Sequence, residues 1–319
     1  MNSSIADLRI RPHVRETPLA RSGWLSDVSN ASVFLKLENL QETGSFKLRG
    51  AASKILSLAA GQASRGIVVA STGNHAIATS TIGGKLGIPV DIYVSEQLHP
   101  LKRGKIESLG ARVHTVAGDA LLAELTARRE ADASGRPYVS PYNDAEVVAG
   151  QGTVAVEILR QLDDSGVAKL DAIFVAVGGG GLIGGIGMHL EEFSPGTEVV
   201  GCWPENSQAL HECMRAGAFL DDYTDKPTYS TSTAGGIEPG AITLEIARRV
   251  IDRSILVTEA EILDATRRYY REERQPIEGA AGVAVAAFLK QAADYAGKTV
   301  AIVICGANLD PGFEALVKA

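Results

Sequence analysis

The chain has 319 residues, of which 45% are hydrophobic and 22% are charged, a composition typical of globular proteins, and its length suggests two domains. Its net charge of -7 and the lack of a Lys/Arg-rich tract argue against a nucleic-acid-binding protein. No apolar run reaches membrane-spanning length, and residues 1–10 lack the pattern of a signal peptide. Cys202, Cys213 and Cys305 show no metal-ligand spacing, so we expect reduced cysteines in a cytoplasmic protein.

The first clear element is a strand at residues 33–38, where apolar and polar residues alternate. A helix is predicted at 48–58, and the turn between them has the sequence TGSFK at residues 43–47. We expect Ser45 to cap this helix and Lys47 to lie in its first turn. A helix N-terminus disfavours a cation and burial lowers a lysine's pKa, so Lys47 is a candidate nucleophile toward an aldehyde; a solvated lysine is the alternative.

The rest of the chain alternates short apolar strands with helices, which indicates an α/β fold with mostly parallel, twisted sheets flanked by helices. A polar loop is predicted at 140–149 and an irregular stretch at 219–240. The predicted strands are 66–70, 90–94, 112–116, 171–177, 198–202, 254–257 and 299–305. The predicted helices are 76–86, 100–110, 120–133, 151–162, 182–190, 242–250, 259–272 and 279–293.

Four consecutive glycines lie at residues 178–181, between an apolar strand and a helix. Glycines let the backbone approach a phosphate, and the helix N-terminus supplies unpaired N–H groups. Gly179, Gly181 and Gly184 also satisfy the G-x-G-x-x-G pattern of dinucleotide sites, with Glu205 roughly 20 residues further on. Anion binding is favoured over close packing of strand and helix, but the pattern leaves the anion open.

A second polar turn, STGNH at residues 71–75, also joins a strand to a helix. Its hydroxyls, amide and backbone N–H groups suit a carboxylate or another small anion, although such residues are common in turns. His75 is a candidate base or a structural histidine. The last strand ends in a third polar turn, CGAN at residues 305–308, where Cys305 is most simply a small buried residue.

In parallel α/β sheets, ligands bind beyond the carboxyl ends of the strands, where all three turns are expected to lie. Together with Lys47 they offer a nucleophilic amine, a phosphate-binding loop and a small-anion loop. An aldehyde cofactor that carries a phosphate accounts for all of these features, whereas a nicotinamide dinucleotide leaves Lys47 unexplained.

Several ordered motifs resemble those of the serine/threonine dehydratase family, pyridoxal-phosphate enzymes of fold type II. The lysine motif SFKLRGA at 45–51 is similar to the family's, as are the turn at 71–76 and the glycine loop at 178–182. AGQGT at 149–153, and IE with AGV at 277–283, match further family segments. The resemblance extends from about residue 15 to residue 308. It implies a large domain, residues 1–45 and 141–319, with a small domain, residues 46–140, inserted in it.

The resemblance also implies roles for individual residues. Lys47 holds the cofactor and removes the substrate's Cα proton, and Phe46 packs on the cofactor ring. Asn74 bonds the ring hydroxyl, and Cys305 lies beside the ring nitrogen. The substrate-binding residues implied are Ser71, Thr72, Gly73, Asn74 and His75, with Thr72 also given a catalytic part. The phosphate-binding residues implied are Gly178, Gly179, Gly180, Gly181 and Leu182.

The activity implied is β-elimination from a 3-hydroxy amino acid such as L-threonine or L-serine, giving a 2-oxo acid and ammonia. Alternatives are other 3-hydroxy amino acids (of the hydroxyectoine-breakdown type or an aryl-serine), β-replacement, and racemisation, which the alanine at 123 disfavours. A non-catalytic ligand sensor is a further alternative, against which Lys47 argues. An NAD-dependent oxidoreductase is the alternative of a different class. The resemblance suggests a homodimer, and we expect no metal, because Thr231 and Gly235 replace carboxylates that bind a cation in some relatives.

Overall fold

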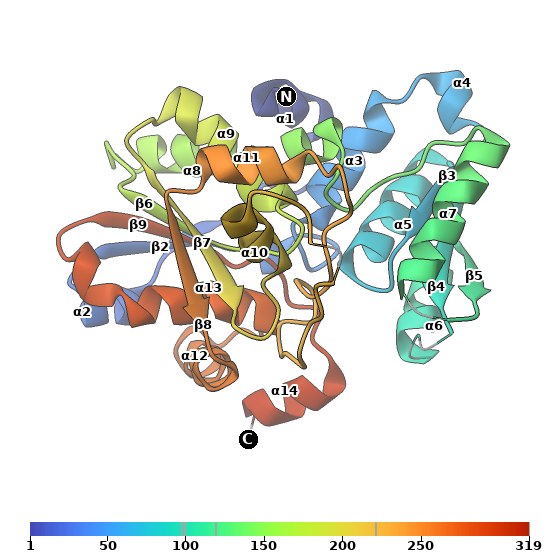
Figure 1. Ribbon diagram of the computed structural model, residues 1–319. Coiled ribbons are helices and arrows are strands. Elements are labelled where there is room, and N and C mark those ends of the chain that lie inside the picture. Colours follow the sequence, from blue (N-terminus) through green and yellow to red (C-terminus); the bar gives the residue numbers. More distant parts are fainter. Residues whose placement is uncertain (97, 99, 119, 221, 319) are drawn as a thin grey trace.

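The computed structural model describes the whole chain except residues 97, 99, 119, 221 and 319. Figure 1 shows two α/β bodies of unequal size, with the smaller one on the right. None of the described helices has the length and apolar character needed to cross a membrane.

The larger body is built on a six-stranded sheet with the order β1-β2-β9-β6-β7-β8. Only β1 runs antiparallel to its neighbour, and the other four pairs are parallel. The inner strands are almost continuously apolar because helices cover both faces of the sheet. The strands are β1 (Leu19–Arg21), β2 (Ser32–Lys36), β6 (Ala172–Ala176), β7 (Glu198–Pro204), β8 (Arg253–Val257) and β9 (Thr299–Val303).

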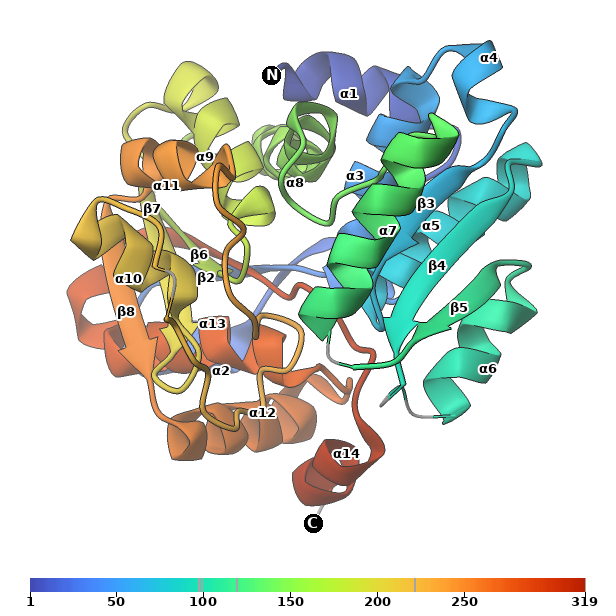
Figure 2. The ribbon, with the colours of Figure 1, turned by 45° about the vertical axis from the view of Figure 1, so that its right-hand side comes forward.

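The smaller body holds a separate, fully parallel sheet with the order β3-β4-β5. It has its own apolar core, distinct from the core of the six-stranded sheet. Figure 2 shows α7 in front of this sheet, with α5 on the opposite side. The elements are β3 (Ile67–Ala70), β4 (Val90–Ser95), β5 (Arg112–Val116), α3 (Lys47–Ser57), α4 (Ala60–Ala63), α5 (Asn74–Leu86), α6 (Pro100–Ser108) and α7 (Ala120–Ser134).

Helices around the large sheet complete the fold, and the α/β fold with mostly parallel sheets is confirmed. Helix α13 packs against β6, β7, β8 and β9, whereas α8 and α9 lie above the sheet in Figure 1. The α-helices are α1 (Ser3–Ile10), α2 (Gly23–Ser29), α8 (Ala145–Asp164), α9 (Gly181–Phe193), α10 (Ala209–Ala216), α11 (Thr243–Val250), α12 (Glu259–Glu273), α13 (Gly279–Lys290) and α14 (Pro311–Lys318). Two short 3-10 helices are η1 (Glu38–Leu40) and η2 (Ala292–Tyr295).

The prediction of a loop at 140–149 is wrong in its second half, because α8 already begins at Ala145. The Asp144 side chain accepts hydrogen bonds from the backbone N–H groups of Glu146 and Val147, at 2.8 and 3.2 Å. An aspartate in this position is a strong N-cap, so the polar residues mark the start of a helix. Local patterns also gave no prediction of β1 or of the short helices α1, α2, α4, α10 and α14.

Candidate active site

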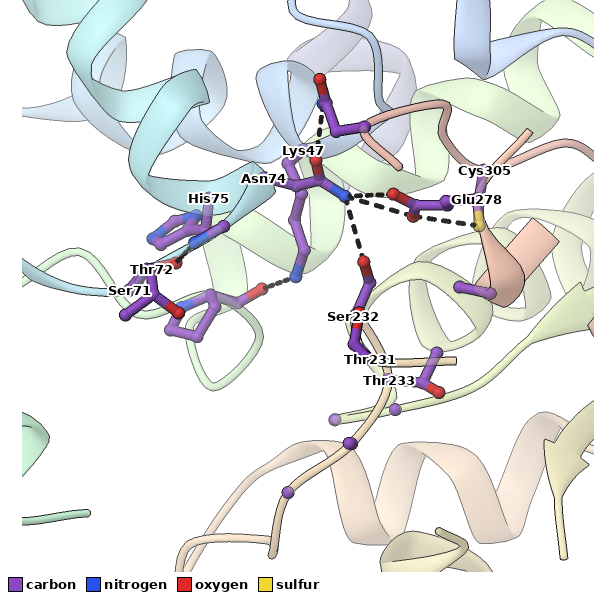
Figure 3. A pocket seen from close by; sticks show the side chains of 18 of the residues that line it. Lys47, Ser71, Thr72, Asn74, His75, Thr231, Ser232, Thr233, Glu278 and Cys305 are labelled. Carbon is purple, nitrogen blue, oxygen red and sulfur yellow. Dashed lines mark hydrogen bonds between the residues drawn. The ribbon is translucent and has the colours of Figure 1, made fainter. Parts of the chain in front are cut away.

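A cavity of about 520 Å³ lies where the two sheets point the carboxyl ends of β3, β6 and β9 toward each other. It brings together every residue that the sequence analysis proposed for cofactor or substrate binding. Those residues are Phe46, Lys47, Ser71, Thr72, Gly73, Asn74, His75, Gly178, Gly179, Gly180, Gly181, Leu182 and Cys305. Figure 3 shows Lys47 between the turn that holds Ser71 and Thr72 and the pair Glu278 and Cys305.

Lys47 is the first residue of α3, and its side chain extends into the cavity. Its Nζ donates a hydrogen bond of 2.9 Å to the carbonyl of Pro141 and lies 5.2 Å from the centre of the Phe46 ring. Burial lowers the pKa of Lys47 to about 8. The lysine is therefore far more reactive as an amine than a solvated lysine at neutral pH.

The predicted cap at Ser45 is wrong. The N-cap position of α3 belongs to Phe46, without a side-chain bond, and the buried Ser45 Oγ has no hydrogen-bond partner in the described chain. Ser45 instead forms an antiparallel bridge with Gly306. This bridge joins the lysine turn to the turn after β9, with Phe46 N donating to the Cys305 carbonyl at 3.1 Å. Backbone contacts thus fix Lys47 relative to Cys305.

The turn at residues 71–73 leads into α5, whose first residue is Asn74. The Gly73 N–H donates to Ser71 Oγ at 3.3 Å, which orders the turn. The first N–H groups of a helix have no partner within the helix, and its dipole favours an anion. Ser71 and Thr72 line the cavity at this point, so the turn is suited to hold a carboxylate.

His75 is buried and its ring is held in one orientation. Its Nε2 lies 2.9 Å from the Val139 carbonyl, an acceptor, so Nε2 carries the proton and Nδ1 does not. Burial, followed by the charge of Lys47, lowers the pKa of His75 to about 3. His75 therefore stays neutral at physiological pH, and its Nδ1 is buried without a partner in the described chain.

Each of the four glycines after β6 has a steric reason for lacking a side chain. A Cβ atom at Gly178 would lie 2.9 Å from the Thr233 backbone, and one at Gly179 would lie 2.4 Å from the Tyr142 ring. Gly180 has a φ of +82° and caps α9, and Gly181 also contacts Tyr142. The loop therefore packs closely and also lines the cavity at a helix N-terminus, so close packing and anion binding are compatible explanations of the glycines.

Cys305 is buried at the end of β9, with its Sγ 4.0 Å from Glu278 Oε1. Burial raises the pKa of the Cys305 thiol well above its ordinary range, so the group is a neutral thiol. The environment keeps this side chain uncharged at the edge of the cavity.

The segment at 231–236 forms another wall of the cavity. No cluster of three or more His, Cys, Asp and Glu side chains suited to a metal occurs among the residues that the structure describes. Of the nearby aspartates, Asp225 accepts a hydrogen bond from Gly235 N at 2.6 Å, whereas Asp221 lies outside the described residues.

Sequence reasoning gave no role to Tyr142, Glu278 or Asn308, which all line the cavity. The last two had a signal, because Glu278 lies in a motif of the resembled family and Asn308 ends the polar turn after β9. Tyr142 had none, because its contact with the glycine loop joins segments that no local pattern connects.

Comparison with known proteins identifies the family. The family model described as pyridoxal-phosphate dependent enzyme matches residues 10–306. The chain belongs to this family. Its cofactor is pyridoxal phosphate, and the residues present fit that group: Lys47 supplies an amine of lowered pKa for the aldehyde, and the glycine loop at the α9 N-terminus supplies a phosphate site. Because the family is pyridoxal-phosphate dependent, the alternative interpretation of Gly179 to Gly184 as an NAD site is wrong.

Three similar proteins carry different names. The chain is 38% identical over 297 residues to L-threonine ammonia-lyase of Thermotoga maritima, covering 93% of this chain and 72% of that protein. It is 32% identical over 303 residues to beta-hydroxyaspartate dehydratase of Paracoccus denitrificans, covering 95% and 93%. The crystal structure of serine racemase from Dictyostelium discoideum superposes with a TM-score of 0.86 at 30% identity, covering 97% of each chain.

Proposed function

We propose that this protein is a pyridoxal-phosphate-dependent dehydratase, an ammonia-lyase that converts a 3-hydroxy amino acid such as L-threonine or L-serine to a 2-oxo acid and ammonia. The observation that carries the proposal is Lys47, an amine of lowered pKa in the same cavity as a glycine loop and the polar turn at 71–73. The relatives from Thermotoga and Paracoccus, named as ammonia-lyase and dehydratase, support it.

The cavity residues divide the chemistry among them. When bound, pyridoxal phosphate withdraws electrons from the substrate's Cα, which makes the Cα proton acidic and allows the β-hydroxyl to leave. Lys47 holds the cofactor and then takes the Cα proton, since its lowered pKa lets the free amine accept a proton near neutral pH. Ser71, Thr72 and the α5 N-terminus hold the substrate carboxylate. Backbone N–H groups of residues 178–182 hold the phosphate.

Phe46, Asn74 and Cys305 surround the cofactor ring in this proposal. Phe46 would pack on the ring face, Asn74 would bond the ring oxygen, and Cys305 would lie at the ring nitrogen. A neutral thiol there would leave the nitrogen largely unprotonated, which would favour prompt elimination over transamination. The neutral His75 ties the first turn of α5 to residue 139 through its bond to the Val139 carbonyl.

Two lysines at the cavity support a second substrate class. Lys105 Nζ bonds only the neutral Asn308 Oδ1 among the contacts described, at 2.9 Å, and Lys102 Nζ lies 3.8 Å from Asp310 Oδ2. A substrate whose β-carbon carries a carboxylate would find a cation there, as in the reaction that names the Paracoccus relative. We expect Lys105→Met to lower kcat/KM for 3-hydroxyaspartate by a larger factor than kcat/KM for L-threonine, because both reactions share the bond from Lys105 to Asn308 but only the first substrate carries a second carboxylate.

We further propose a cytoplasmic homodimer with the nested domains that the sequence suggests, 46–140 inserted between 1–45 and 141–319. The separate sheets and separate cores of the two bodies support the domain boundaries. Three free, buried cysteines support a reducing compartment. Ile5 and Leu8 on α1 are 55% and 80% exposed, which supports association of two chains. Light scattering of the purified protein measures its mass in solution.

Two measurements test the proposed reaction. Purified protein with pyridoxal phosphate should be yellow, and borohydride reduction followed by peptide mapping should label Lys47, with Lys47→Ala as the unlabelled control. Release of 2-oxo acid from L-threonine, L-serine, 3-hydroxyaspartate and an aryl-serine then ranks the substrates, and chiral analysis of the remaining substrate detects racemisation. A label elsewhere, or no 2-oxo acid from any of these substrates, would contradict the proposal.

A further inference from the structure

Glu278 is a buried acid to which the proposed mechanism gives no part. It precedes α13, lines the cavity and is only 4% exposed. At an N-cap position a carboxylate commonly accepts N–H groups of its own helix, but Glu278 forms no such bond. Its carboxyl group faces the Asn74 amide instead (Figure 3). Burial raises the pKa of Glu278 in spite of the hydrogen bonds that it accepts, so a specific interaction is needed to explain an acid here.

The orientation of the neighbouring Asn308 amide follows from two contacts. Lys105 Nζ, which only donates, lies 2.9 Å from Asn308 Oδ1. The Thr43 carbonyl, which only accepts, lies 2.9 Å from Asn308 Nδ2. Both contacts require the same assignment of oxygen and nitrogen, so Asn308 cannot turn its amide over without losing both.

Asn308 in turn determines the orientation of Asn74. Its Nδ2 donates to Asn74 Oδ1 at 2.6 Å, so the Asn74 oxygen faces Asn308 and its nitrogen faces Glu278. Asn74 Nδ2 lies 3.2 and 3.0 Å from the two carboxyl oxygens of Glu278. Both oxygens accept from this nitrogen, so Glu278 and Asn308 require the same orientation of the Asn74 amide.

The second hydrogen of Asn74 Nδ2 remains for a group in the cavity. The Ser232 Oγ on the opposite wall is 3.5 Å away, at the limit of a hydrogen bond, and lies in an exposed segment. Among the described contacts of Asn74, those with Asn308 and Glu278 therefore fix the orientation of its amide. The free N–H of Asn74 Nδ2 points to the cavity as a hydrogen-bond donor.

Two glycines provide the space for this arrangement. A Cβ atom at Gly306 would lie 2.7 Å from Glu278 Oε1, and one at Gly44, where φ is +74°, would lie 3.2 Å from the Asn308 amide. Both glycines belong to the turns that position Lys47 and Cys305. The backbone of the active-site turns thus closely approaches both partners of Asn74.

We propose that Glu278 and Asn308 are positioning residues that hold the Asn74 amide with its N–H groups toward the cavity, so that Asn74 can only donate to the cofactor's ring oxygen. The inference rests on the proposed function, in which Asn74 contacts that oxygen. A donor favours the ionised ring oxygen, whereas an amide oxygen in its place would require the protonated hydroxyl. Glu278 and Asn308 thereby control the protonation state of the bound cofactor through Asn74.

Asn308→Asp is the main test because it is nearly isosteric and reverses the hydrogen-bond polarity. The new carboxylate would draw the Asn74 nitrogen toward itself and turn the Asn74 oxygen to Glu278 and the cavity. We expect the holoenzyme at neutral pH to shift absorbance from the long-wavelength visible band to the near-ultraviolet band, changing the band ratio at least about threefold. We also expect cofactor affinity, measured by titrating apo-protein, to fall about tenfold.

Substitutions at Glu278 separate positioning from charge. Glu278→Leu removes the acceptor and should shift the spectrum in the same direction as Asn308→Asp. Glu278→Gln keeps an acceptor oxygen for Asn74 and should restore the wild-type spectrum and affinity. Circular dichroism melting of each apo-protein checks that it is folded, and Asn308→Asp supplies the test if Glu278→Leu does not fold.

The results distinguish this inference from the proposed function. If the wild-type protein fails to label at Lys47, the proposed function fails. If the wild type labels but folded Asn308→Asp keeps the wild-type spectrum and affinity, only this inference is wrong. Equal losses of cofactor affinity in Glu278→Gln and Glu278→Leu would also overturn this inference, because the charge of Glu278 rather than its hydrogen bond to Asn74 would then matter.

Discussion

Lys47 illustrates how one residue acquires its chemistry from its position. Burial lowers its pKa from the ordinary 10.5 to about 8. At neutral pH about one such lysine in ten is a neutral amine, compared with about one in three thousand for an unperturbed lysine. The acidic groups of Cys305 and Glu278 act in the opposite direction and raise this pKa, but burial outweighs them.

The rate at which apo-protein captures pyridoxal phosphate should report this pKa. Because only the neutral amine attacks an aldehyde, we expect the rate to rise about tenfold per pH unit below about pH 8 and to level off above it. Stopped-flow absorbance from about pH 6 to about pH 10 measures the rate, and an Nα-acetyl-lysine control corrects for the titration of the cofactor itself. A rise that continues to pH 10, as in the control, would show that Lys47 is not perturbed.

Helix α8 is the element that fixes the spacing of the site, because it packs directly against α3 and α9 through glycines. A Cβ atom at Gly150 of α8 would lie 2.6 Å from the carbonyl of Arg49 in α3. A Cβ atom at Gly185 of α9 would lie 2.5 Å from the backbone N of Gly152 in α8. Helix α3 begins with Lys47 and α9 follows the glycine loop, so the backbone contacts of α8 set the distance between lysine and loop.

We expect Gly185→Ala to lower the free energy of unfolding by about 1–3 kcal/mol, because backbone atoms on both helices would have to move apart. Gly104→Ala is the matched control, since Gly104 also lies in a helix but has nothing within 4 Å of the added atom. The control should raise stability by about 0.5–1 kcal/mol through helix propensity. Urea denaturation measures both, and equal effects of the two substitutions would refute the tight helix contact.

On the scale of the whole molecule, a buried ion cluster joins the two bodies behind the active site. Arg49 in α3 bonds Glu38 at 2.8 Å and Glu157 of α8 at 2.7 Å, and Lys36 of β2 bonds Glu157 at 2.6 Å. All four side chains are fully buried. Burial alone would raise the pKa of Glu157, but the charges of Arg49 and Lys36 lower it to about 2. Glu157 therefore remains ionised over the physiological range.

Glu157→Gln should cost about 3–5 kcal/mol of stability, because it leaves buried cations without their full countercharge. The pKa of Glu157 is lower in the folded chain than its ordinary 4.5. Its ionised carboxylate therefore contributes its full share of the folding stability above pH 4.5, and this share is lost as the pH falls toward 2. Denaturant melts across this range should show a smaller pH dependence in the variant than in the wild type. Glu314→Gln, in the exposed pair with Lys318, should change nothing measurable.

The sequence predicted elements well where local patterns were strong and failed where they were weak. The strand at 112–116 has the predicted bounds, since three of its five residues are β-branched and glycines at 110 and 118 flank it. The start of α8 was missed because Asp144, read as a loop residue, is a cap. Helix α1 was missed because eight residues of mixed character carry little periodicity and its stability comes from packing against α8.

By itself the sequence determined the α/β class, the family, the lysine turn and the glycine loop, because each depends on residues close together in the chain. Only the tertiary structure decided which groups surround Asn74, because Glu278 and Asn308 lie 204 and 234 residues away along the chain. The same holds for the burial that makes Lys47 an amine near neutral pH, since the surrounding atoms come from several segments. Local propensity specifies where turns occur, whereas desolvation and hydrogen-bond polarity arise only when those turns meet at the end of the sheets.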